Sequence, residues 1–463
     1  MTDRPPIAAV VLAAGKGTRM KSELPKGLHQ VCGLPLVEHV GRALKGAGVE
    51  RPVVVVGYGA DEMQRALGTS YEFVIQSEQL GTGHAVMASR DALERVTGQV
   101  LVVPGDTPLI TSESLIELVE RHRTSEASLT MVTCSVADAT GYGRIVRDST
   151  GDIVAIVEHK DCTAEQLNIT EINAAVYCFD CAKLLDVLPG LQSDNVQGEY
   201  YLTDVVRAFS SKGHRIASIS GDSSEFAGVN DRWHLALANE SMQLRILASL
   251  AASGVTIADP RSTSIEADVE VELDVTIGPC TVIAGGTRIA KGTVIGPNCW
   301  IKDSVIGADC RVVMSHLDQV TLADEVRCGP FANIRPGTKL GKRAKVGNFV
   351  EVKNSTFGTA AFASHLAYVG DAEIGDGVNI GAGTITCNYD GFVKHRTFIG
   401  AGAFVGSNST LIAPINIGAG AIVAAGSVIS EDVPADALAI GRSRQELKEQ
   451  WAKSWRKRKT AQS

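Results

Sequence analysis

Two different patterns of apolar residues divide the chain. Up to about residue 230, short continuous apolar runs bounded by Gly or Pro alternate with stretches of helical periodicity. Such runs are typical of strands buried on both faces of a parallel sheet, with helices in the crossovers. The first part therefore predicts a doubly wound α/β domain. Its expected strands are residues 7–14, 53–57, 71–76, 100–106 and 129–136.

From residue 265, aliphatic residues recur at every sixth position. The series begins at Ile265 and runs to Ile301, and the same step returns over residues 334–352, 374–380 and 399–429. No helix has this period, whereas a parallel β-helix does, because each triangular coil takes three six-residue repeats with the aliphatic residues stacked inward. We therefore expect a left-handed parallel β-helix of hexapeptide repeats after the α/β domain.

Glycine content and one helical stretch place the boundary between the two constructions. Residues 254–441 hold 25 of the 47 glycines, as expected where a chain turns many tight corners. Residues 231–253 carry an uninterrupted helical pattern. We therefore expect a first domain over residues 1–230, a linker helix over 231–253, and a β-helical domain over 254–463 that ends in a basic tail from residue 442.

The six-residue period fails in three places of the second part. The breaks lie between Ile301 and Ile334, across residues 353–373, and over residues 386–396. Insertions into a solenoid fall on one face and often form its binding surface. We therefore expect a second binding site at these breaks. The cysteines of the coils are expected to serve as small packing residues, and they are Cys280, Cys299, Cys310 and Cys328.

Charge, hydropathy and cysteine spacing exclude several classes of protein. The formal net charge of −8 argues against a nucleic-acid-binding protein. No apolar stretch reaches 18 residues and the first residues do not resemble a secretory leader, so we expect no membrane partner and a cytoplasmic location. The close pair Cys178 and Cys181 lacks ligands at zinc spacing, and we interpret it as two reduced thiols at a strand end.

A glycine-containing loop directly follows the first expected strand. Residues 12–20 have the sequence LAAGKGTRM. Backbone N–H groups of such a loop can hold phosphate groups, and the side chains of Lys16, Arg19 and Lys26 could neutralise their charge. The glycine spacing of P-loop kinases and of Rossmann dehydrogenases is absent. The loop therefore predicts a phosphate site of another class.

This loop, followed by Pro25 and Lys26, resembles the start of sugar-1-phosphate nucleotidyltransferases, which implies a Rossmann-like nucleotidyltransferase domain. Joined to the hexapeptide repeats, the sequence resembles the bacterial bifunctional family of N-acetylglucosamine-1-phosphate uridylyltransferases and glucosamine-1-phosphate N-acetyltransferases, from residue 7 to about 442. The further matching segments are residues 76–85, 104–106, 141–145, 156–158, 171–173 and 228–231.

The resemblance implies a first site that converts UTP and N-acetylglucosamine 1-phosphate into UDP-N-acetylglucosamine and pyrophosphate. Asp106 and Asn230 would hold Mg²⁺, and Arg19 and Lys26 would act on the phosphates. Without the resemblance, Asp106 would be interpreted as a strand-end cap and Asn230 as a helix N-cap. The residues implied to bind UTP and the product are Leu12, Ala13, Ala14, Gly15, Lys26, Gln76, Gly81, Thr82, Pro104, Gly105, Asp106, Gly143, Glu158, Asn173 and Asn230.

One residue of this set departs from the family pattern. Pro104 stands where the family often has Tyr. Proline donates no backbone N–H, so any contact at this position has to come from its ring or its carbonyl group.

The resemblance also implies a second site, which transfers an acetyl group from acetyl-CoA to glucosamine 1-phosphate. His365 would be the general base, although a His among apolar neighbours is by itself more often a packing residue. The residues implied to hold glucosamine 1-phosphate are Arg335, Lys353, Tyr368, Asn379 and Lys394. Those implied to hold acetyl-CoA are Ala382, Asn388, Tyr389, Ser407, Ala425 and Arg442, with Ser407 a candidate oxyanion donor.

The same family implies a homotrimer with active sites between subunits. The tail after Gly441 carries eight basic and two acidic residues, and it either forms a short helix around Trp451 and Trp455 or stays solvated.

Two alternative functions stay open: a nucleotidyltransferase whose β-helix only oligomerises or regulates, and a non-catalytic interaction protein. The polar side chains concentrated at the period breaks favour the bifunctional enzyme.

Overall fold

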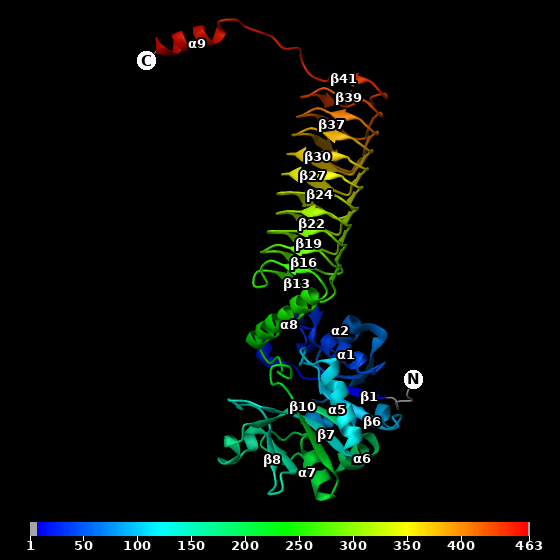
Figure 1. Ribbon diagram of the computed structural model, residues 1–463, viewed down its shortest axis with the longest axis vertical. Helices are drawn as coiled ribbons and strands as arrows, with labels where there is room; N and C mark the ends of the chain where they lie inside the picture. Colours follow the sequence, from blue (N-terminus) through cyan, green and yellow to red (C-terminus); the bar gives the residue numbers. More distant parts are fainter. Residues whose placement is uncertain (1–6, 462–463) are drawn as a thin grey trace. The chain divides into compact units, whose positions relative to one another are not determined.

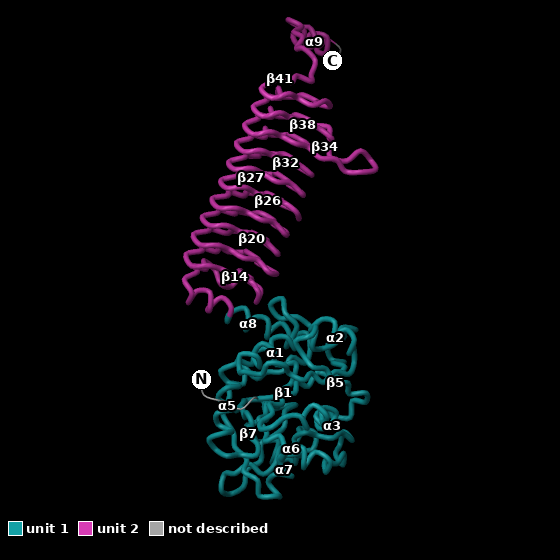
Figure 2. The backbone as a smooth tube through the Cα atoms, turned by 90° about the vertical axis from the view of Figure 1, so that its right-hand side faces the viewer, with its two compact units in different colours: residues 1–245 teal, residues 246–463 magenta. Residues whose placement is uncertain are grey.

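The computed structural model describes residues 7–461. The chain forms two compact units, divided between Arg245 and Ile246 (Figure 2). Each unit has its own hydrophobic core, so each holds its own elements in place.

The first unit is built on a nine-stranded mixed sheet, with seven strands in the order β11-β7-β10-β6-β1-β4-β5 and a hairpin of β8 and β9 beside β10. The strands are β1 (Ile7–Leu12), β4 (Val53–Val56), β5 (Glu72–Ile75), β6 (Gln99–Pro104), β7 (Leu129–Ser135), β8 (Arg144–Arg147), β9 (Ile153–Val157), β10 (Glu171–Asp180) and β11 (Ile216–Ser220). A separate small ladder pairs β2 (Gln30–Val31) with β3 (Leu34–Pro35).

Helices cover both faces of this sheet, as the doubly wound prediction requires. The α-helices are α1 (Leu36–Gly46), α2 (Ala60–Leu67), α3 (Thr82–Ala88), α4 (Arg90–Leu93), α5 (Ser112–Thr124), α6 (Cys181–Val187) and α7 (Asp204–Ser211). Short 3₁₀ helices are η1 (Thr18–Met20), η2 (Lys26–Leu28), η3 (Gly68–Ser70), η4 (His159–Asp161), η5 (Gln166–Asn168) and η6 (Leu188–Gly190).

Successive residues of the central strands pack into two different cores. Ala9 and Val11 of β1 pack with α1 and α5, whereas Val10 packs with α3, α6 and α7. Side chains of a strand point alternately to opposite faces, so a strand covered on both sides has to be apolar throughout. This requirement explains the continuous apolar runs and confirms all five predicted strands within one to two residues at each end.

The longest strand of the sheet, β10, was not predicted from the sequence pattern. It runs antiparallel to both of its neighbours, β6 and β7, so the sheet is mixed rather than wholly parallel. A register shift between Asn173 and Tyr177 interrupts its pairing with β7, and Ala175 within it has φ 58°. The irregular segment breaks the run of strand-forming positions. Cys178 lies near the end of this strand and Cys181 begins α6, both as free, buried thiols.

Helix α8 (Arg232–Ala252) follows, and the division between the two units falls within it. The second unit consists of three parallel sheets of 11, 10 and 9 strands, whose rungs stack from β13 to β41 in Figure 1. Each coil contributes one strand to each sheet, which confirms the β-helix of hexapeptide repeats. The chain ends in helix α9 (Trp451–Thr460), where the rings of Trp451 and Trp455 stack at 6.2 Å.

The strands of the β-helix are two to four residues long. Each of its three sheets takes every third strand up to β40, and β41 then pairs with β39 in the first sheet. The first sheet has β12 (Thr256–Ile257), β15 (Thr276–Ile277), β18 (Val294–Ile295), β21 (Arg311–Val312), β24 (Arg327–Cys328), β27 (Lys345–Asn348), β30 (Phe362–His365), β33 (Asn379–Ile380), β36 (Phe404–Val405), β39 (Ile422–Val423) and β41 (Leu438–Ala439). The second has β13 (Ser264–Ile265), β16 (Val282–Ala284), β19 (Trp300–Lys302), β22 (His316–Asp318), β25 (Asn333–Ile334), β28 (Glu351–Lys353), β31 (Tyr368–Gly370), β34 (Ile385–Cys387), β37 (Thr410–Ile412) and β40 (Val428–Ile429). The third has β14 (Glu270–Val271), β17 (Arg288–Ile289), β20 (Val305–Ile306), β23 (Thr321–Leu322), β26 (Lys339–Leu340), β29 (Thr356–Phe357), β32 (Ala372–Ile374), β35 (Thr397–Ile399) and β38 (Ile415–Ile417).

Two of the three period breaks prove to be ordinary coil, so the expectation of insertions there is wrong, whereas a binding site at the breaks stays a prediction. Between Ile301 and Ile334, some repeats are five residues long instead of six, and the coil continues through Ile306 and Leu317. Across residues 353–373 the coil likewise continues, with inward positions at Phe357, Ala363, Val369 and Ile374. A shortened corner shifts the phase without interrupting the stack. Only the third break leaves the coil, as a loop that projects beyond β34 in Figure 2.

Cysteine occupies some of the inward positions of the coils, so the six-residue series of aliphatic residues is interrupted in the sequence. Cys328 stands in register with Val312 and Val346, in a column of otherwise aliphatic inward residues. Its burial, like that of Cys299 and Cys310, confirms the packing prediction. Cys280 contradicts it: the residue is exposed and has φ 54°, because it turns a corner between two strands instead of facing inward.

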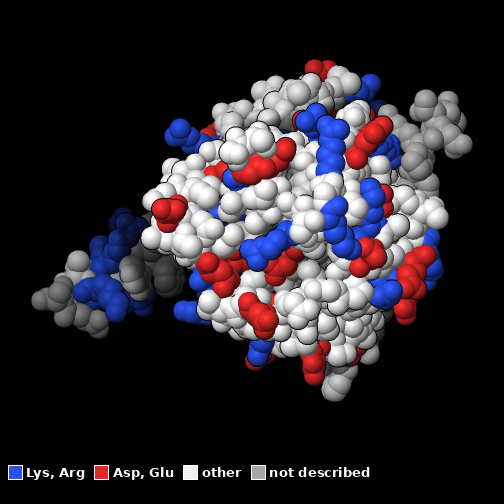
Figure 3. Space-filling model, turned by 90° about the horizontal axis from the view of Figure 1, so that it is seen from below, with Lys and Arg blue, Asp and Glu red and all other residues white. Residues whose placement is uncertain are grey.

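Acidic and basic side chains are interspersed over the face of the molecule displayed in Figure 3. Among residues 7–461, every helix is too short or too polar to cross a membrane.

Candidate active sites

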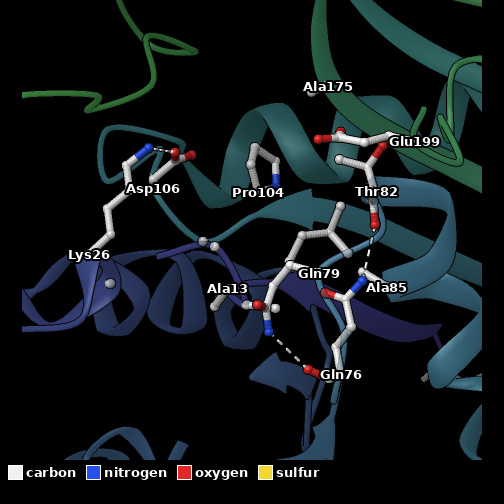
Figure 4. Close-up of a pocket in the computed structure, with 16 residues that line it drawn as sticks. Ala13, Lys26, Gln76, Gln79, Thr82, Ala85, Pro104, Asp106, Ala175 and Glu199 are labelled. Atoms are coloured by element: carbon white, nitrogen blue, oxygen red, sulfur yellow. Dashed lines mark hydrogen bonds and ion pairs between the residues drawn. The ribbon is translucent and has the colours of Figure 1, made fainter. Parts of the chain in front are cut away.

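The first candidate site is a cavity of about 350 Å³ at the carboxyl ends of β1 and β6 (Figure 4). Open α/β sheets bind ligands at this edge. The predicted residues that line the cavity are Leu12, Ala13, Ala14, Gly15, Lys26, Gln76, Gly81, Thr82, Pro104, Gly105 and Asp106. The lining residues that the sequence did not predict are Gly27, Gln79, Ala85, Ala175 and Glu199.

Local backbone geometry explains the shape of the phosphate loop. Gly17 has φ 64°, and a Cβ atom there would lie 2.7 Å from Cβ of Lys26. Glycine therefore lets the loop pack directly against the stem of Lys26. At the end of the neighbouring strand β6, the N–H of Gly105 donates to the carbonyl of Leu12 at 2.9 Å. Pro104 contributes its ring to the cavity, and its carbonyl accepts a hydrogen bond from the Thr107 hydroxyl.

Polar side chains converge at one end of this cavity. Lys26 Nζ donates to a carboxylate oxygen of Asp106 and, at 3.1 Å, to Oδ1 of Asn230. Arg19 donates to the same Asn230 oxygen at 2.9 Å. The two predicted metal ligands thus direct oxygen atoms at a single cation. A carboxylate and an amide oxygen are donors that Mg²⁺ accepts, so the residues present fit the ion.

The amide group of Gln76 is held firmly in the cavity wall. Its Nε2 donates to the Gly81 carbonyl at 3.1 Å and lies 2.9 Å from Nδ1 of His84. In Figure 4 the bond to the Gly81 carbonyl is drawn, and the amide oxygen is turned toward the interior of the cavity.

Three predicted sugar-binding residues lie outside this cavity. Glu158 lines a second cavity of about 510 Å³, and its carboxylate accepts a hydrogen bond from the Thr203 hydroxyl at 3.1 Å. Burial raises the pKa of Glu158. A Cβ atom at Gly143 would lie 3.5 Å from both Glu158 carboxylate oxygens, so these two residues adjoin. The amide of Asn173 is buried and bonded to the Tyr177 hydroxyl at 2.6 Å.

The second candidate site contains a group of basic side chains on the β-helix. Arg335 directly follows β25, and Lys353 is the last residue of β28. Because Ile334 pairs with Val352 in register, these two basic residues stand next to each other on successive coils. The ammonium of Lys394 beside Lys353 lowers the pKa of the Lys353 ammonium, and Arg335 adds to the effect. Glu351 pairs with Arg335 at 2.8 Å. Mutual repulsion among three cations favours binding of an anion, such as a sugar phosphate.

Tyr368 and Asn388 meet next to this group. The amide nitrogen of Asn388 donates to the buried carboxylate of Asp371 and lies 3.5 Å from the Tyr368 hydroxyl. A Cβ atom at Gly370 would lie 2.5 Å from that hydroxyl, so glycine provides the space for the tyrosine ring. Asn354 donates to the other carboxylate oxygen of Asp371 at 2.5 Å. No motif in the sequence marks Asp371 or Asn354, since both stand in ordinary corner positions.

His365 is exposed at the end of β30 and lies on one corner of the β-helix. Predicted acetyl-CoA residues follow on the next coils of the same corner. The carbonyl of Ala382 accepts from Asn408 N–H at 2.7 Å, and that of Ser407 accepts from Gly426 N–H at 2.8 Å. Ala425 immediately precedes Gly426, where a Cβ atom would lie 3.7 Å from Cδ of Arg442. These residues therefore form one column along the coils.

Two predicted residues lie apart from their expected neighbours. Asn379 stands in register with Phe362 and Phe404 in the first sheet of the β-helix, whereas Tyr368 belongs to the second sheet. Tyr389 projects from the loop after β34, where its hydroxyl donates to the Gly391 carbonyl at 2.6 Å. Its ring is more than half exposed.

Comparison with known proteins covers both units. The family model of the MobA-like NTP transferase domain matches residues 9–195. Three similar proteins each bear the name Bifunctional protein GlmU. The relative from Geobacillus thermodenitrificans is 48% identical over 452 residues, which cover 97% of this chain and 98% of the relative. The relatives from Carboxydothermus hydrogenoformans and Exiguobacterium sibiricum are 47% and 48% identical, over 96% and 95% of this chain and 99% and 98% of their own lengths.

The chain belongs to the bifunctional GlmU family.

Membership in the GlmU family extends over both units, so this chain is a bifunctional transferase. Family membership excludes the two alternatives that the sequence left open, which were a nucleotidyltransferase with a passive β-helix and a non-catalytic interaction protein. Within the GlmU chain, the residues missed by sequence analysis fall into two kinds. Gln79 lies inside a matching segment and could have been included, whereas Glu199 reaches the cavity from a loop without any motif.

Proposed function

We propose that the chain makes UDP-N-acetylglucosamine in two steps. The second unit transfers an acetyl group from acetyl-CoA to the amine of glucosamine 1-phosphate. The first unit then transfers a uridylyl group from UTP to the resulting N-acetylglucosamine 1-phosphate and releases pyrophosphate. The full-length similarity to the GlmU family is the observation that carries this proposal. Its substrates are small molecules.

In the uridylyl transfer, a phosphate oxygen of the sugar phosphate attacks the α-phosphorus of UTP, and the bond to the pyrophosphate oxygen breaks. Positioning and charge neutralisation supply the catalysis in reactions of this class. Arg19 and Lys26 neutralise the phosphates, and the loop from Leu12 to Gly15 supplies backbone N–H groups. Mg²⁺ bound by Asp106 and Asn230 would screen the phosphate charge. Glu158, Gly143 and Asn173 are proposed to hold the sugar.

In the acetyl transfer, the amine nitrogen attacks the thioester carbonyl of acetyl-CoA, and the carbon–sulfur bond breaks to release CoA as its thiol. His365 takes the proton from the amine, and the Ser407 hydroxyl donates to the developing oxyanion. The basic group of Arg335, Lys353 and Lys394 holds the sugar phosphate. The column formed by Ala382, Ser407, Ala425 and Arg442 supports the placement of CoA. Asn388 and Tyr389 are also proposed to contact CoA, from the end of β34 and the loop that follows it.

We also propose a homotrimer that works in the cytoplasm. His365 lies on one side of the corner between β30 and β31, while Tyr368 lies on the other, in a different sheet of the β-helix. A neighbouring subunit would bring groups from both faces to one substrate, which supports an active site between subunits. Sedimentation equilibrium is expected to give a trimer mass, and a monomer with full acetyltransferase activity would contradict the proposal.

Two substitutions test the two activities separately. The His365→Ala chain should lose acetyl transfer and keep uridylyl transfer from UTP to added N-acetylglucosamine 1-phosphate. The Asp106→Ala chain should do the reverse, since its β-helix is untouched. Products are identified by mass after incubation with glucosamine 1-phosphate, acetyl-CoA, UTP and Mg²⁺. Absence of UDP-N-acetylglucosamine with the unsubstituted chain would refute the proposed function.

A further inference from the structure

The wall of the first cavity contains one buried amide whose two donors are both used. Gln76 is 3% exposed. Its Nε2 is bonded to the Gly81 carbonyl at 3.1 Å and to His84 Nδ1 at 2.9 Å. A primary amide has two N–H donors and one carbonyl acceptor. Both donors of Gln76 are therefore engaged inside the protein, and only Oε1 remains for a ligand.

The orientation of the Gln76 amide is set by the backbone carbonyl of Gly81. A backbone carbonyl only accepts hydrogen bonds, so the Gly81 carbonyl requires the nitrogen end of the Gln76 amide to face it. The same nitrogen then donates to His84, which makes Nδ1 of His84 an acceptor and places the ring proton on Nε2. With both hydrogens used, Oε1 faces the cavity, as Figure 4 shows.

The chain around Tyr200 holds both acceptors in place. The Tyr200 carbonyl accepts from Gly83 N–H at 2.7 Å, and the Tyr200 N–H donates to the Leu80 carbonyl at 2.8 Å. The rings of Tyr200 and His84 lie 6.3 Å apart. A Cβ atom at Gly81 would lie 2.6 Å from the Tyr200 carbonyl oxygen, so the two backbones are in close contact. His84 and the Gly81 carbonyl are thus fixed relative to Gln76 from both sides.

We infer that His84 is a positioning residue for nucleobase selection. The Gly81 carbonyl decides which end of the amide is the nitrogen, and His84 accepts the second N–H and so holds the amide from turning. Gln76 Oε1 is thereby kept in place as an acceptor at the edge of the base. Uracil presents an N–H donor at N3, which suits this acceptor. Cytosine presents a lone pair at N3, and two facing acceptors repel each other. The inference rests on the proposed function, because it concerns how the first unit distinguishes UTP from CTP.

The test compares kcat/KM for UTP and for CTP with N-acetylglucosamine 1-phosphate, in the full chain. His84→Phe retains a ring beside Tyr200 and removes the acceptor, so the preference for UTP should fall about fivefold or more, the effect of losing a buried hydrogen bond. His84→Asn restores an acceptor near the position of Nδ1 and should keep the preference within about twofold. His84→Leu is a second variant without an acceptor, and urea denaturation of the first unit in the same chains reports whether that unit is still folded.

The outcomes separate the inference from the proposed function. A fall in the UTP preference for both acceptor-free variants, with recovery in His84→Asn, supports the inference. An unchanged preference in His84→Phe, or an equal loss with both nucleotides, overturns it and leaves a structural role. If the unsubstituted chain makes no sugar nucleotide from UTP, the proposed function itself fails and this inference falls with it.

Discussion

A single ammonium group occupies the point where the polar ends of Asp106 and Asn230 meet. Lys26 Nζ lies within hydrogen-bond distance of both side chains, and its own side chain is largely buried. The Asp106 carboxylate oxygen and the Asn230 amide oxygen both accept from this ammonium, so together they favour a positive charge at this point. The divalent cation proposed for this site would therefore have to compete with the Lys26 ammonium until phosphate groups attract the lysine.

Replacing this lysine should separate metal binding from catalysis. In Lys26→Met, Asp106 and Asn230 lose the cation that they share, while Arg19 still donates to the Asn230 oxygen. The Asp106 carboxylate is then free of its ion pair, so Mn²⁺ should bind more tightly in the absence of nucleotide. Uridylyl transfer should fall about a hundredfold, because a charge that stabilises the transition state is gone. Calorimetric titration with Mn²⁺ and a steady-state assay measure the two effects. Weaker Mn²⁺ binding in Lys26→Met would contradict this explanation, and Asp106→Asn is the control expected to abolish binding.

A buried histidine in the first unit makes its stability depend on pH. His122 on α5 is 2% exposed, and its Nδ1 lies 3.0 Å from the Thr130 hydroxyl. Burial lowers the pKa of His122 to about 4, with Lys183 and Arg123 lowering it further against the opposing effect of Asp180. In the unfolded chain the pKa is about 6.5. The neutral ring is therefore favoured by folding, and this stability is lost as the pH falls from 6.5 toward 4.

His122→Leu should remove that part of the pH dependence. A shift from about 6.5 to about 4 corresponds to about 3 kcal/mol between neutral and acid conditions. The free energy of unfolding of the first unit, followed by urea denaturation at pH 7 and pH 4, should fall less in the variant than in the unsubstituted chain by roughly this amount. An equal fall in both proteins would show that other groups cause the acid sensitivity.

At the scale of the element, the β-helix depends on columns of inward residues. Each inward side chain stacks on the one a coil below, as in the series of Ile277, Ile295, Val312 and Cys328. Removal of one member leaves a cavity that the coils above and below cannot fill, because their backbones are fixed by ladder hydrogen bonds. In a repeat of five residues the apolar residue still lies in the column, because only the corner is shortened.

Two adjacent residues in the region of the first period break test this explanation. Ile306 is 1% exposed and faces inward, whereas its neighbour Val305 is 47% exposed and faces outward. Ile306→Ala should lower the free energy of unfolding of the second unit by about 2–4 kcal/mol, and Val305→Ala by less than about 1 kcal/mol. Chemical denaturation of the two variants measures the difference. Similar costs at both positions would mean that this segment is not a regular coil.

At the scale of the whole molecule, two units with separate cores support two separate chemistries. The cores of the first unit lie on the two faces of the mixed sheet, and the core of the second is the interior of the β-helix. Each candidate site draws its side chains from one of these units. Substitutions in one unit should therefore change the stability and the activity of that unit.

Calorimetry should resolve this independence as two unfolding transitions. Ile306→Ala should lower the midpoint of one transition and leave the other in place, because the replaced side chain packs only within the β-helix. Uridylyl transfer by the same variant should match that of the unsubstituted chain at temperatures below both transitions. A single transition that shifts as a whole would show that the units unfold together.

The extent of prediction from sequence differed between the units for a physical reason. Strands buried on both faces have to be apolar throughout, and this made β1, β4, β6 and β7 predictable. Strand β5 lies at the edge of the sheet and is only partly buried, and its short apolar run made it predictable. Strand β10 was not predicted, because the irregular segment around Ala175 interrupts it. The repeats were predictable wherever six residues separate the inward positions. The repeats were not recognised in the sequence where corners are shortened, or where Cys328 and Ala363 stand in place of Ile, Leu or Val in the column.

The sequence by itself determined the two constructions, the residues of the phosphate loop and the resemblance that gathers the site residues. Those features depend on local pattern and side-chain type, which can be read directly along the chain. Only the tertiary structure decided that Lys26 stands between Asp106 and Asn230, that Gly370 makes room for Tyr368, and that His84 orients Gln76. Contacts of this kind depend on distances between segments far apart in the chain, and hydrophobic pattern carries no information about them.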